Sequence, residues 1–311
     1  MRLANHGGRL VLLRAGGEGD LDGTTAIDVN LASRGAIPSE PDLAYEHWDE
    51  VRRLAEDPPD DAAQVTVEQG LLRSPSPRPR QVFGVGVNYA DHGDEAGMAA
   101  PEVPLIFTKL TTAVTGPFAR IPLSSATVDW EAEIAVVIGR RAERVDASRA
   151  WSHVAGITAG QDLSDRDIQW RPRSTPQFCL GKSLAGFAPL GPTLVSVDEY
   201  PDPDDIELRC LLNGEQVQRS SSGRMLLSVP EIIAYLSGIV ALYPGDVIFT
   251  GTPGGIGMTR TPPRYLRPGD TLQTFVAGAG TMSHTFTAGC GQAPERAHRA
   301  SGRFAREGSD S

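Results

Sequence analysis

Three acidic residues at alternate positions lie near the middle of the chain. Asp129, Glu131 and Glu133 belong to the run 128–139, in which apolar residues alternate with the others at the period of a β-strand. The side chains of residues i and i+2 point to the same face of a strand, roughly 7 Å apart. Carboxylates this close repel one another unless a positive charge lies between them. The pattern therefore predicts a bound divalent cation.

A third carboxylate can reach the same place from the polar, turn-rich run 160–169. Three carboxylates, with water and substrate oxygens completing the shell, suit Mg²⁺ or Mn²⁺, and the lack of interleaved His or Cys argues against zinc. The alternative is that Glu131 and Glu133 form the solvated face of an edge strand. Spacing alone leaves both interpretations open.

A second pair of residues with catalytic potential follows a predicted strand at 81–87. If residues 88–95 form a helical turn, His92 and Glu95 share a face at positions i and i+3. The carboxylate then orients the imidazole and raises its basicity, so the pair can take a proton from water. Gly93 costs a helix about 1 kcal/mol relative to Ala, which indicates a short, mobile element such as a lid. The alternative is an exposed polar turn.

Four ordered motifs resemble the fumarylacetoacetate hydrolase (FAH) family: VDWEAEIAVVIG, GQDLSDRD, GKS at 181–183 and TGTPGGIG at 250–257. The family's metal ligands are the two Glu residues of an E-x-E strand and the Asp that opens D-x-S-x-R-D. The resemblance therefore implies that Glu131, Glu133 and Asp162 hold the metal. Members that hydrolyse acylpyruvates carry N-Y-x-x-H-x-x-E on a lid over the metal, which implies the same placement for His92 and Glu95.

The resemblance extends to other residues around the metal. Lys182, in GKS, is expected to be catalytic by neutralising negative charge that forms during reaction, although its type also fits a surface lysine. Lys109 stands where the family usually has a lysine near the site, and the loop around Thr252 contacts substrate in the family. The residues expected to bind substrate are Tyr89, Lys109, Arg166, Gln169 and Thr252. Two positions depart from many relatives: Gln161 replaces Asn, and Arg224 replaces a small or acidic residue.

Turn signals indicate the scaffold that must position these residues. Asn213 and Gly214 lie between two strand-like runs and suit the type I′ turn of a hairpin. Ser228 and Glu231 have the spacing of a capping box at the start of an apolar helix. The turn L-x-P-G-D occurs twice, each time before a strand, which favours an antiparallel β-roll or sandwich over a doubly wound sheet. We predict an α+β, mainly β fold of the FAH type, a mixed β-sandwich or β-roll with a few flanking helices.

The chain divides into four predicted segments. Residues 1–73 form a small N-terminal α/β domain, and the Pro-rich stretch 74–80 is an extended, solvated linker. Residues 81–288 form the FAH-type catalytic domain. The polar stretch 289–311 is a disordered tail.

Composition limits the partners and the cellular location. The 311 residues include 40% hydrophobic residues and carry a net charge of −10, which gives no attraction for nucleic acid or for an anionic membrane. Three cysteines at distant positions read as reduced thiols, and no apolar run is long enough for a signal or membrane-spanning segment. We expect a cytoplasmic protein that binds a small oxo-acid substrate, and the resemblance implies a homodimer.

The expected function is hydrolysis. A divalent metal can chelate a 2-oxo acid or 1,3-diketone through two oxygens and stabilise an enolate, while the His92–Glu95 pair activates water. We predict a metal-dependent hydrolase that cleaves a C–C bond in acylpyruvates or other β-diketo acids. One alternative is an isomerase or decarboxylase of 2-oxo or 2-hydroxy-diene dioates in aromatic catabolism. Another is a non-catalytic metal-binding scaffold.

Overall fold

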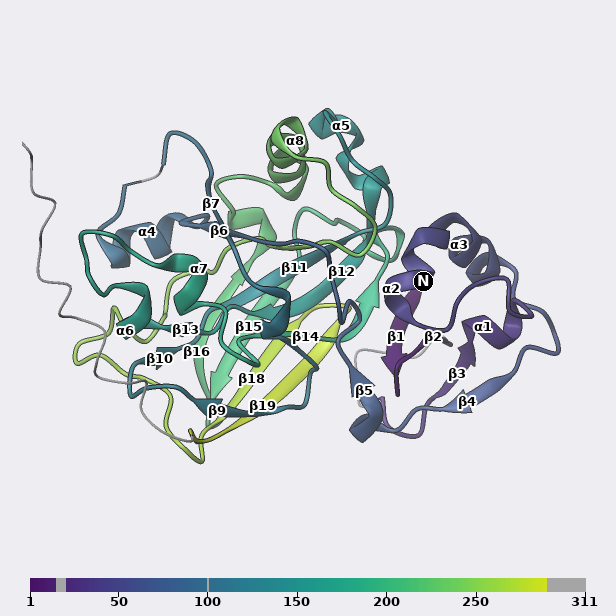
Figure 1. Cartoon of the computed structure of the whole chain (residues 1–311), viewed down its shortest axis with the longest axis horizontal. Helices are drawn as coiled ribbons and strands as arrows, with labels where there is room; N and C mark the ends of the chain where they lie inside the picture. The colour runs from purple at the N-terminus through teal and green to yellow at the C-terminus, as the bar shows by residue number, and fades with distance from the viewer. Residues whose placement is uncertain (15–20, 100, 290–311) are drawn as a thin grey trace, which may run out of the picture.

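A 12-stranded sheet of mixed direction runs through the computed structural model, which describes residues 1–14, 21–99 and 101–289. Figure 1 shows β11, β12 and β14 near the centre of the molecule and β1 to β4 at one end. In spatial order the main path consists of β4 (Gln64–Thr66), β3 (Thr25–Asp28), β2 (Arg9–Leu13), β1 (Arg2–His6), β14 (Ala188–Val195), β12 (Val154–Gln161), β11 (Ala132–Ile138), β17 (Val247–Phe249), β6 (Val82–Gly86) and β7 (Leu105–Thr108). β5 (Leu72–Arg73) pairs with β1, and β8 (Val114–Thr115) pairs with β14.

A five-stranded sheet forms the second layer. Its strands, in spatial order, are β16 (Glu215–Ser221), β15 (Glu207–Leu212), β18 (Thr271–Val276), β19 (Gly280–Ala288) and β9 (Arg120–Leu123). A separate two-stranded ribbon pairs β10 (Val128–Asp129) with β13 (Ser164–Asp165). One hydrophobic core joins the inner faces of the two large sheets. This mainly β, two-layer architecture confirms the predicted fold class.

β11 is buried on both faces. Ile134 and Val136 belong to the core between the sheets, whereas Ala135 and Val137 belong to a second core with Trp48 of the N-terminal region. The strand alternation predicted one apolar and one polar face. β11 instead lies between β12 and β17 in the middle of the large sheet, so the acidic residues at its start are enclosed by protein. The alternative of a solvated edge strand is therefore wrong.

Short helices cover the sheets and connect the strands. They are α1 (Val29–Ala32), α2 (Pro41–Ala44), α3 (Trp48–Glu56), α4 (Ala90–Ala96), α5 (Ala147–Ala150), α6 (Arg166–Gln169), α7 (Phe178–Gly181) and α8 (Val229–Ile239). The capping box is confirmed at α8, where Ser228 and Glu231 bond to each other's backbone N–H. Asn213 and Gly214 both have positive φ, 54° and 82°, as the type I′ hairpin turn requires. In Figure 1, α4, α6 and α7 lie together at the end of the molecule away from β1 to β4.

The N-terminal residues share the large sheet with the region after residue 81, because β1 pairs with β14 in antiparallel register. The stretch 74–80 is not the solvated linker that was predicted. Ser74, Pro75 and Ser76 are buried. Tyr45 Oη donates to Pro75 O at 3.0 Å, and Ser76 Oγ donates to Gly245 O at 2.6 Å. These contacts fasten the segment to both sides, and the predicted domain boundaries themselves stay a prediction.

Three further expectations concern termini, cysteines and membranes. Of the predicted tail, all but Gly289 lies outside the described residues, as does Cys290. Cys179 and Cys210 are free thiols, in agreement with the expected reduced state. Within the described ranges no helix combines the length and apolar character that crossing a membrane requires.

Candidate functional site

The three predicted metal ligands meet where strand pairing is interrupted between β10 and β11. Glu131 lies in the break, Glu133 is the second residue of β11, and Asp162 follows β12. Carboxylate oxygens of the three residues lie within 4.8 Å of one another, and all three residues are buried. Two amide side chains cause the break, because Gln161 Oε1 accepts the Glu131 N–H at 3.1 Å and Gln218 Oε1 accepts the next N–H at 3.0 Å. The grouping predicted from sequence is therefore present.

Two buried lysines neutralise part of this negative charge. Lys182 Nζ donates to Glu131 Oε2 at 2.6 Å, to Asp162 Oδ2 at 2.7 Å and to Ser164 Oγ at 2.8 Å. These three bonds use every N–H of its ammonium group. Lys109 Nζ forms an ion pair with Asp162 Oδ1. Lys182 is thus a buried member of the site, and the surface-lysine alternative is wrong.

Arg166 connects the carboxylates to Asp129. Its guanidinium donates to Asp129 Oδ2 through Nε at 3.0 Å and Nη2 at 2.8 Å, and Nη2 also lies 2.7 Å from Glu131 Oε1. Asp129 accepts the N–H groups of Gly257 at 2.7 Å and Met258 at 2.9 Å. Asp129 therefore fixes Arg166 and the Gly-rich loop after β17 and is not part of the group that could bind metal.

Glu131 and Glu133 have opposite pKa shifts although only one residue separates them. Burial raises the pKa of Glu131. The positive charges of Lys182 and Arg166 outweigh this effect and hold the pKa well below its ordinary value. Burial, followed by the charges of Asp162 and Glu131, holds the pKa of Glu133 well above its ordinary value. Within the described chain its carboxylate accepts one hydrogen bond, from the Gly251 N–H at 2.7 Å. Of the three carboxylates, Glu133 is the one without an ion pair to any described residue.

These observations fit a hard divalent cation. The donor set consists of carboxylate oxygens, which Mg²⁺ and Mn²⁺ prefer, and it is buried and already assembled. An ion beside Glu133 would remove the repulsion from its neighbours and supply the partner that this carboxylate lacks. The residues that would hold the ion are Glu131, Glu133 and Asp162.

α4 presents the predicted histidine and glutamate. His92 Nδ1 lies 3.1 Å from Glu95 Oε1, as the i, i+3 spacing predicted, and Glu95 Oε2 accepts the Gly255 N–H at 2.8 Å. Burial raises the pKa of Glu95, but the hydrogen bonds from His92 and Gly255 outweigh it, so the pKa lies below its ordinary value and the group stays ionised. Gly93 does not indicate mobility, because it is buried and a Cβ there would lie 3.0 Å from Met98 O. The helix needs Gly93 for close packing, and the exposed-turn alternative is wrong.

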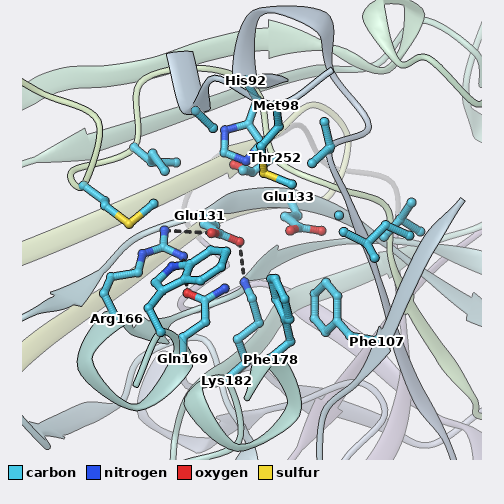
Figure 2. Close-up of a pocket in the computed structure, with 18 residues that line it drawn as sticks. His92, Met98, Phe107, Glu131, Glu133, Arg166, Gln169, Phe178, Lys182 and Thr252 are labelled. Carbon is cyan, nitrogen blue, oxygen red and sulfur yellow. Dashed lines mark hydrogen bonds and ion pairs between the residues drawn. The ribbon is translucent and has the colours of Figure 1, made fainter. Parts of the chain in front are cut away.

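Glu131 and Glu133 line a hollow that opens to solvent, with about 510 Å³ of empty space when the open part is counted. Figure 2 shows that His92 lies on one side of Glu131 and Glu133, while Lys182 and Arg166 lie on the other. A molecule in the hollow therefore lies between a potential base and a cluster of fixed charges.

Three of the five expected substrate-binding residues line the hollow: Arg166, Gln169 and Thr252. Tyr89 and Lys109 do not. Tyr89 is fully buried. Lys109 is 3% exposed, and its ammonium group forms an ion pair with Asp162. Neither residue is among those that line the hollow, and their expected contact with substrate stays a prediction.

Neither departure from the family pattern touches the hollow. Gln161 is buried and supports the backbone beside Glu131, and Arg224 is exposed beside a separate surface depression. Sequence reasoning missed the aromatic residues Phe107, Trp170 and Phe178, which line the hollow. The available signal was weak: two of them flank the GKS and D-x-S-x-R-D motifs, and aromatic residues there also fit an ordinary core.

Comparison with known proteins agrees with the motifs. Residues 81–287 match the family model described as fumarylacetoacetate (FAA) hydrolase C-terminal. Among curated proteins, the mitochondrial oxaloacetate tautomerase Fahd2a of Rattus norvegicus is 42% identical over 216 residues, which are 69% of this chain and 68% of that protein.

Solved structures share the whole architecture. An HpcE-like protein from Mycobacterium smegmatis has a TM-score of 0.84 and 46% sequence identity, and the match covers 93% of this chain and 99% of that chain. A maleylpyruvate hydrolase from Sphingobium sp. SYK-6, solved with a manganese(II) ion and pyruvate, has a TM-score of 0.75 and 26% identity over 93% of this chain and 100% of that chain.

Proposed function

This chain belongs to the fumarylacetoacetate hydrolase family, and on that premise we propose that it is a divalent-metal-dependent enzyme that cleaves a C–C bond in acylpyruvates or similar β-diketo acids. The observation that carries the proposal is the arrangement across one hollow. His92, held by Glu95, faces the buried carboxylates from the opposite side. A molecule bound in the hollow would contact both His92 and the carboxylates that could hold the cation.

Lys182 supplies electrostatic stabilisation, to which a cation held by Glu131, Glu133 and Asp162 would add. Mg²⁺ or Mn²⁺ at the three carboxylates would withdraw electron density from the oxygens of a 2-oxo acid and lower the cost of forming its enolate. Burial lowers the pKa of Lys182, but the charges of Asp162 and Glu131 outweigh this and raise it, so its ammonium group stays charged. A fixed positive charge beside the place where negative charge develops favours that step.

His92 moves the protons. Its Nδ1 is engaged by Glu95, so Nε2 is the ring nitrogen that can accept a proton from water. The hydroxide attacks the distal carbonyl carbon, and the bond from this carbon to C3 breaks with its electron pair forming the enolate of pyruvate. His92 then returns the proton to C3. One water is consumed, and the products are pyruvate and the carboxylic acid of the acyl group.

A second candidate is tautomerisation or another isomerisation of a 2-oxo acid, with decarboxylation as a related outcome. The 42% identical relative is named an oxaloacetate tautomerase, which supports this candidate. The same residues suffice, because His92 would carry a proton from C3 without activating water. The two candidates differ in whether water enters the product.

Product analysis distinguishes them. Purified protein with Mg²⁺ is incubated with acetylpyruvate or with oxaloacetate, and pyruvate, acetate and the enol absorbance are followed. We expect acetylpyruvate to give equal amounts of pyruvate and acetate, and His92→Ala to lose roughly 10²–10⁴-fold in rate while it still binds Mn²⁺. Faster enol–keto conversion of oxaloacetate without acetylpyruvate cleavage would favour the tautomerase. Metal binding without either reaction would favour a non-catalytic scaffold.

A further inference from the structure

We propose that the hollow selects substrates whose distal group is aromatic or similarly flat and apolar, so that an aroylpyruvate binds better than acetylpyruvate or a dicarboxylic oxo acid. This inference deepens the proposed function, because it names the substrate class of the same site. It rests on an aromatic wall, defined here as Phe107, Trp170 and Phe178, and on the absence of an uncommitted cation among the described lining residues.

The aromatic wall is built from three separate segments. Phe107 lies in β7, Trp170 directly follows α6, and Phe178 begins α7. The Phe107 and Phe178 rings are stacked with centroids 6.3 Å apart, and Trp170 meets Phe178 edge-on at 5.2 Å. Each ring is half-buried and lines the hollow. Flat apolar surfaces in this arrangement favour an aromatic or planar guest, since ring pairs gain both contact area and favourable geometry.

Glycines at defined positions make room for this wall. Gly84 lies opposite Phe107 in the register of β6 and β7, and a Cβ at Gly84 would lie 2.3 Å from Phe107 Cζ. A Cβ at Gly181 would lie 2.8 Å from the backbone of Gln169, so only glycine allows α7 to approach α6 this closely. The local sequence therefore lets the Phe107 ring lie against β6 at Gly84 and brings α7, with Phe178, close to α6.

The hollow has a charged end and an apolar end. Lys182 Nζ lies 4.9 Å from the centroid of the Phe107 ring, so the two ends meet between these two residues. In Figure 2, Phe107 and Phe178 lie beyond Lys182 on the side away from Arg166. Met98 and Leu105 also line the hollow and are apolar.

The cations of the lining are already committed. All three N–H groups of Lys182 bond to Glu131, Asp162 and Ser164. Arg166 uses four of its five N–H groups on Asp129, Glu131 and Gln169, so its charge is already paired with carboxylates. Among the described lining residues the remaining basic side chain is His92, which is paired with Glu95. A second carboxylate at the distal end of a substrate would lose its hydration without gaining an ion pair, which costs free energy.

Binding measurements test the inference apart from turnover. The dissociation constants of benzoylpyruvate and acetylpyruvate are measured by calorimetry on Mn²⁺-loaded proteins with the wild-type wall or with Trp170→Ala, Phe178→Leu or Leu180→Ala. Every protein also carries His92→Ala to slow turnover, and cleavage by the protein with His92 intact is followed separately. One methylene in an apolar pocket is worth roughly 10- to 200-fold in discrimination, so a whole ring against a methyl group should favour benzoylpyruvate by about tenfold or more with the wild-type wall. Trp170→Ala and Phe178→Leu should bring the ratio of the two constants toward one.

Leu180→Ala is the matched control. Leu180 lies in α7 beside Phe178, is 54% exposed and is not part of the lining, so the wild-type ratio should be retained. Phe178→Leu removes the ring but keeps an apolar side chain of similar size. It therefore still tests the wall if Trp170→Ala does not fold. Equal affinity of the protein with the wild-type wall for both ligands, or a preference that survives in both wall variants, would overturn the inference. Preferential binding of benzoylpyruvate without cleavage would instead refute the hydrolase proposal and leave the inference standing.

Discussion

Glu133→Gln and Glu131→Gln should have opposite effects on the metal-free protein although both remove a proposed metal ligand. In the absence of metal, Glu133 has two carboxylates within 4.8 Å and accepts one backbone N–H. Two unit charges 4.8 Å apart repel by about 3.5 kcal/mol at an effective dielectric constant of 20. Burial and the two neighbouring charges raise the pKa of Glu133, so its carboxyl group favours the protonated form. Protonation reduces the repulsion, but holding that proton near neutral pH itself costs free energy. Removing its charge should therefore stabilise the metal-free fold by about 1–3 kcal/mol.

Glu131 is in the opposite situation. Its carboxylate lies 2.6 Å from Lys182 Nζ and 2.7 Å from Arg166 Nη2, and all three side chains are buried. Removing one partner of a buried ion pair leaves uncompensated charge and costs about 3–5 kcal/mol. Glu131→Gln should therefore destabilise the metal-free protein. The two variants are isosteric and only one residue apart, so each is the control for the other.

Thermal unfolding with a chelator present measures these changes. A change of 1 kcal/mol shifts the melting temperature of a large domain by roughly 2 °C, so Glu133→Gln should melt roughly 2–6 °C above wild type and Glu131→Gln roughly 6–10 °C below. Calorimetry with Mn²⁺ should show that both lose more than about 100-fold in affinity. Losing a residue that only hydrogen-bonds to a metal ligand costs about 10–100-fold, and losing the ligand itself should cost more. If Glu133→Gln destabilises the metal-free protein as much as Glu131→Gln does, the electrostatic reasoning is refuted. If both bind Mn²⁺ like wild type, the metal site lies elsewhere.

Three further outcomes are expected. Gly84→Ala should destabilise the fold by about 1–3 kcal/mol and weaken binding of benzoylpyruvate, because the new Cβ must displace the Phe107 ring. Gly238→Ala, in α8 with open space around it, should instead stabilise the fold by about 0.4–1 kcal/mol. Denaturant unfolding of both variants compares the two changes. The folded state raises the pKa of Glu133, so a proton competes with the metal for this carboxylate. Mn²⁺ affinity should therefore rise with pH, and metal binding should release a proton. Calorimetry in buffers of different ionisation enthalpy detects that proton. We also propose that the protein is a homodimer, and sedimentation giving a monomer at micromolar concentration would contradict this.

Local spacing was sufficient to predict the parts of the site that depend on one element. The i, i+3 relation of His92 and Glu95 is fixed by helix geometry and gave a contact of 3.1 Å. The capping box of α8 and the turn at Asn213 and Gly214 were equally local. In each case a few neighbouring residues determine the conformation, so the pattern needs no information from distant parts of the chain.

The rest depended on packing between distant segments. Alternation along 128–139 predicted one polar face, but β11 lies between β12 and β17 and has neighbours on both faces. Spacing gave no sign that Lys109 pairs with Asp162 in the folded protein. The aromatic wall combines rings from β7, from the residue after α6 and from α7, which only the tertiary structure brings together. The spacing of residues within one segment does not predict which distant segments will pack against it.

The charge balance of the site sets the order in which its ligands can enter. Four buried carboxylates, those of Asp129, Glu131, Glu133 and Asp162, meet three buried cations, those of Lys109, Lys182 and Arg166. With Glu133 protonated, as its raised pKa favours in the metal-free protein, the cluster is neutral and gives the anion of an oxo acid no net attraction. Loss of that proton leaves one net negative charge, which attracts a divalent cation. Once the cation is bound the balance becomes one positive charge, and the same cluster attracts that anion. A buried acidic triad with too few cations to neutralise it is therefore suited to take the metal first and the substrate second.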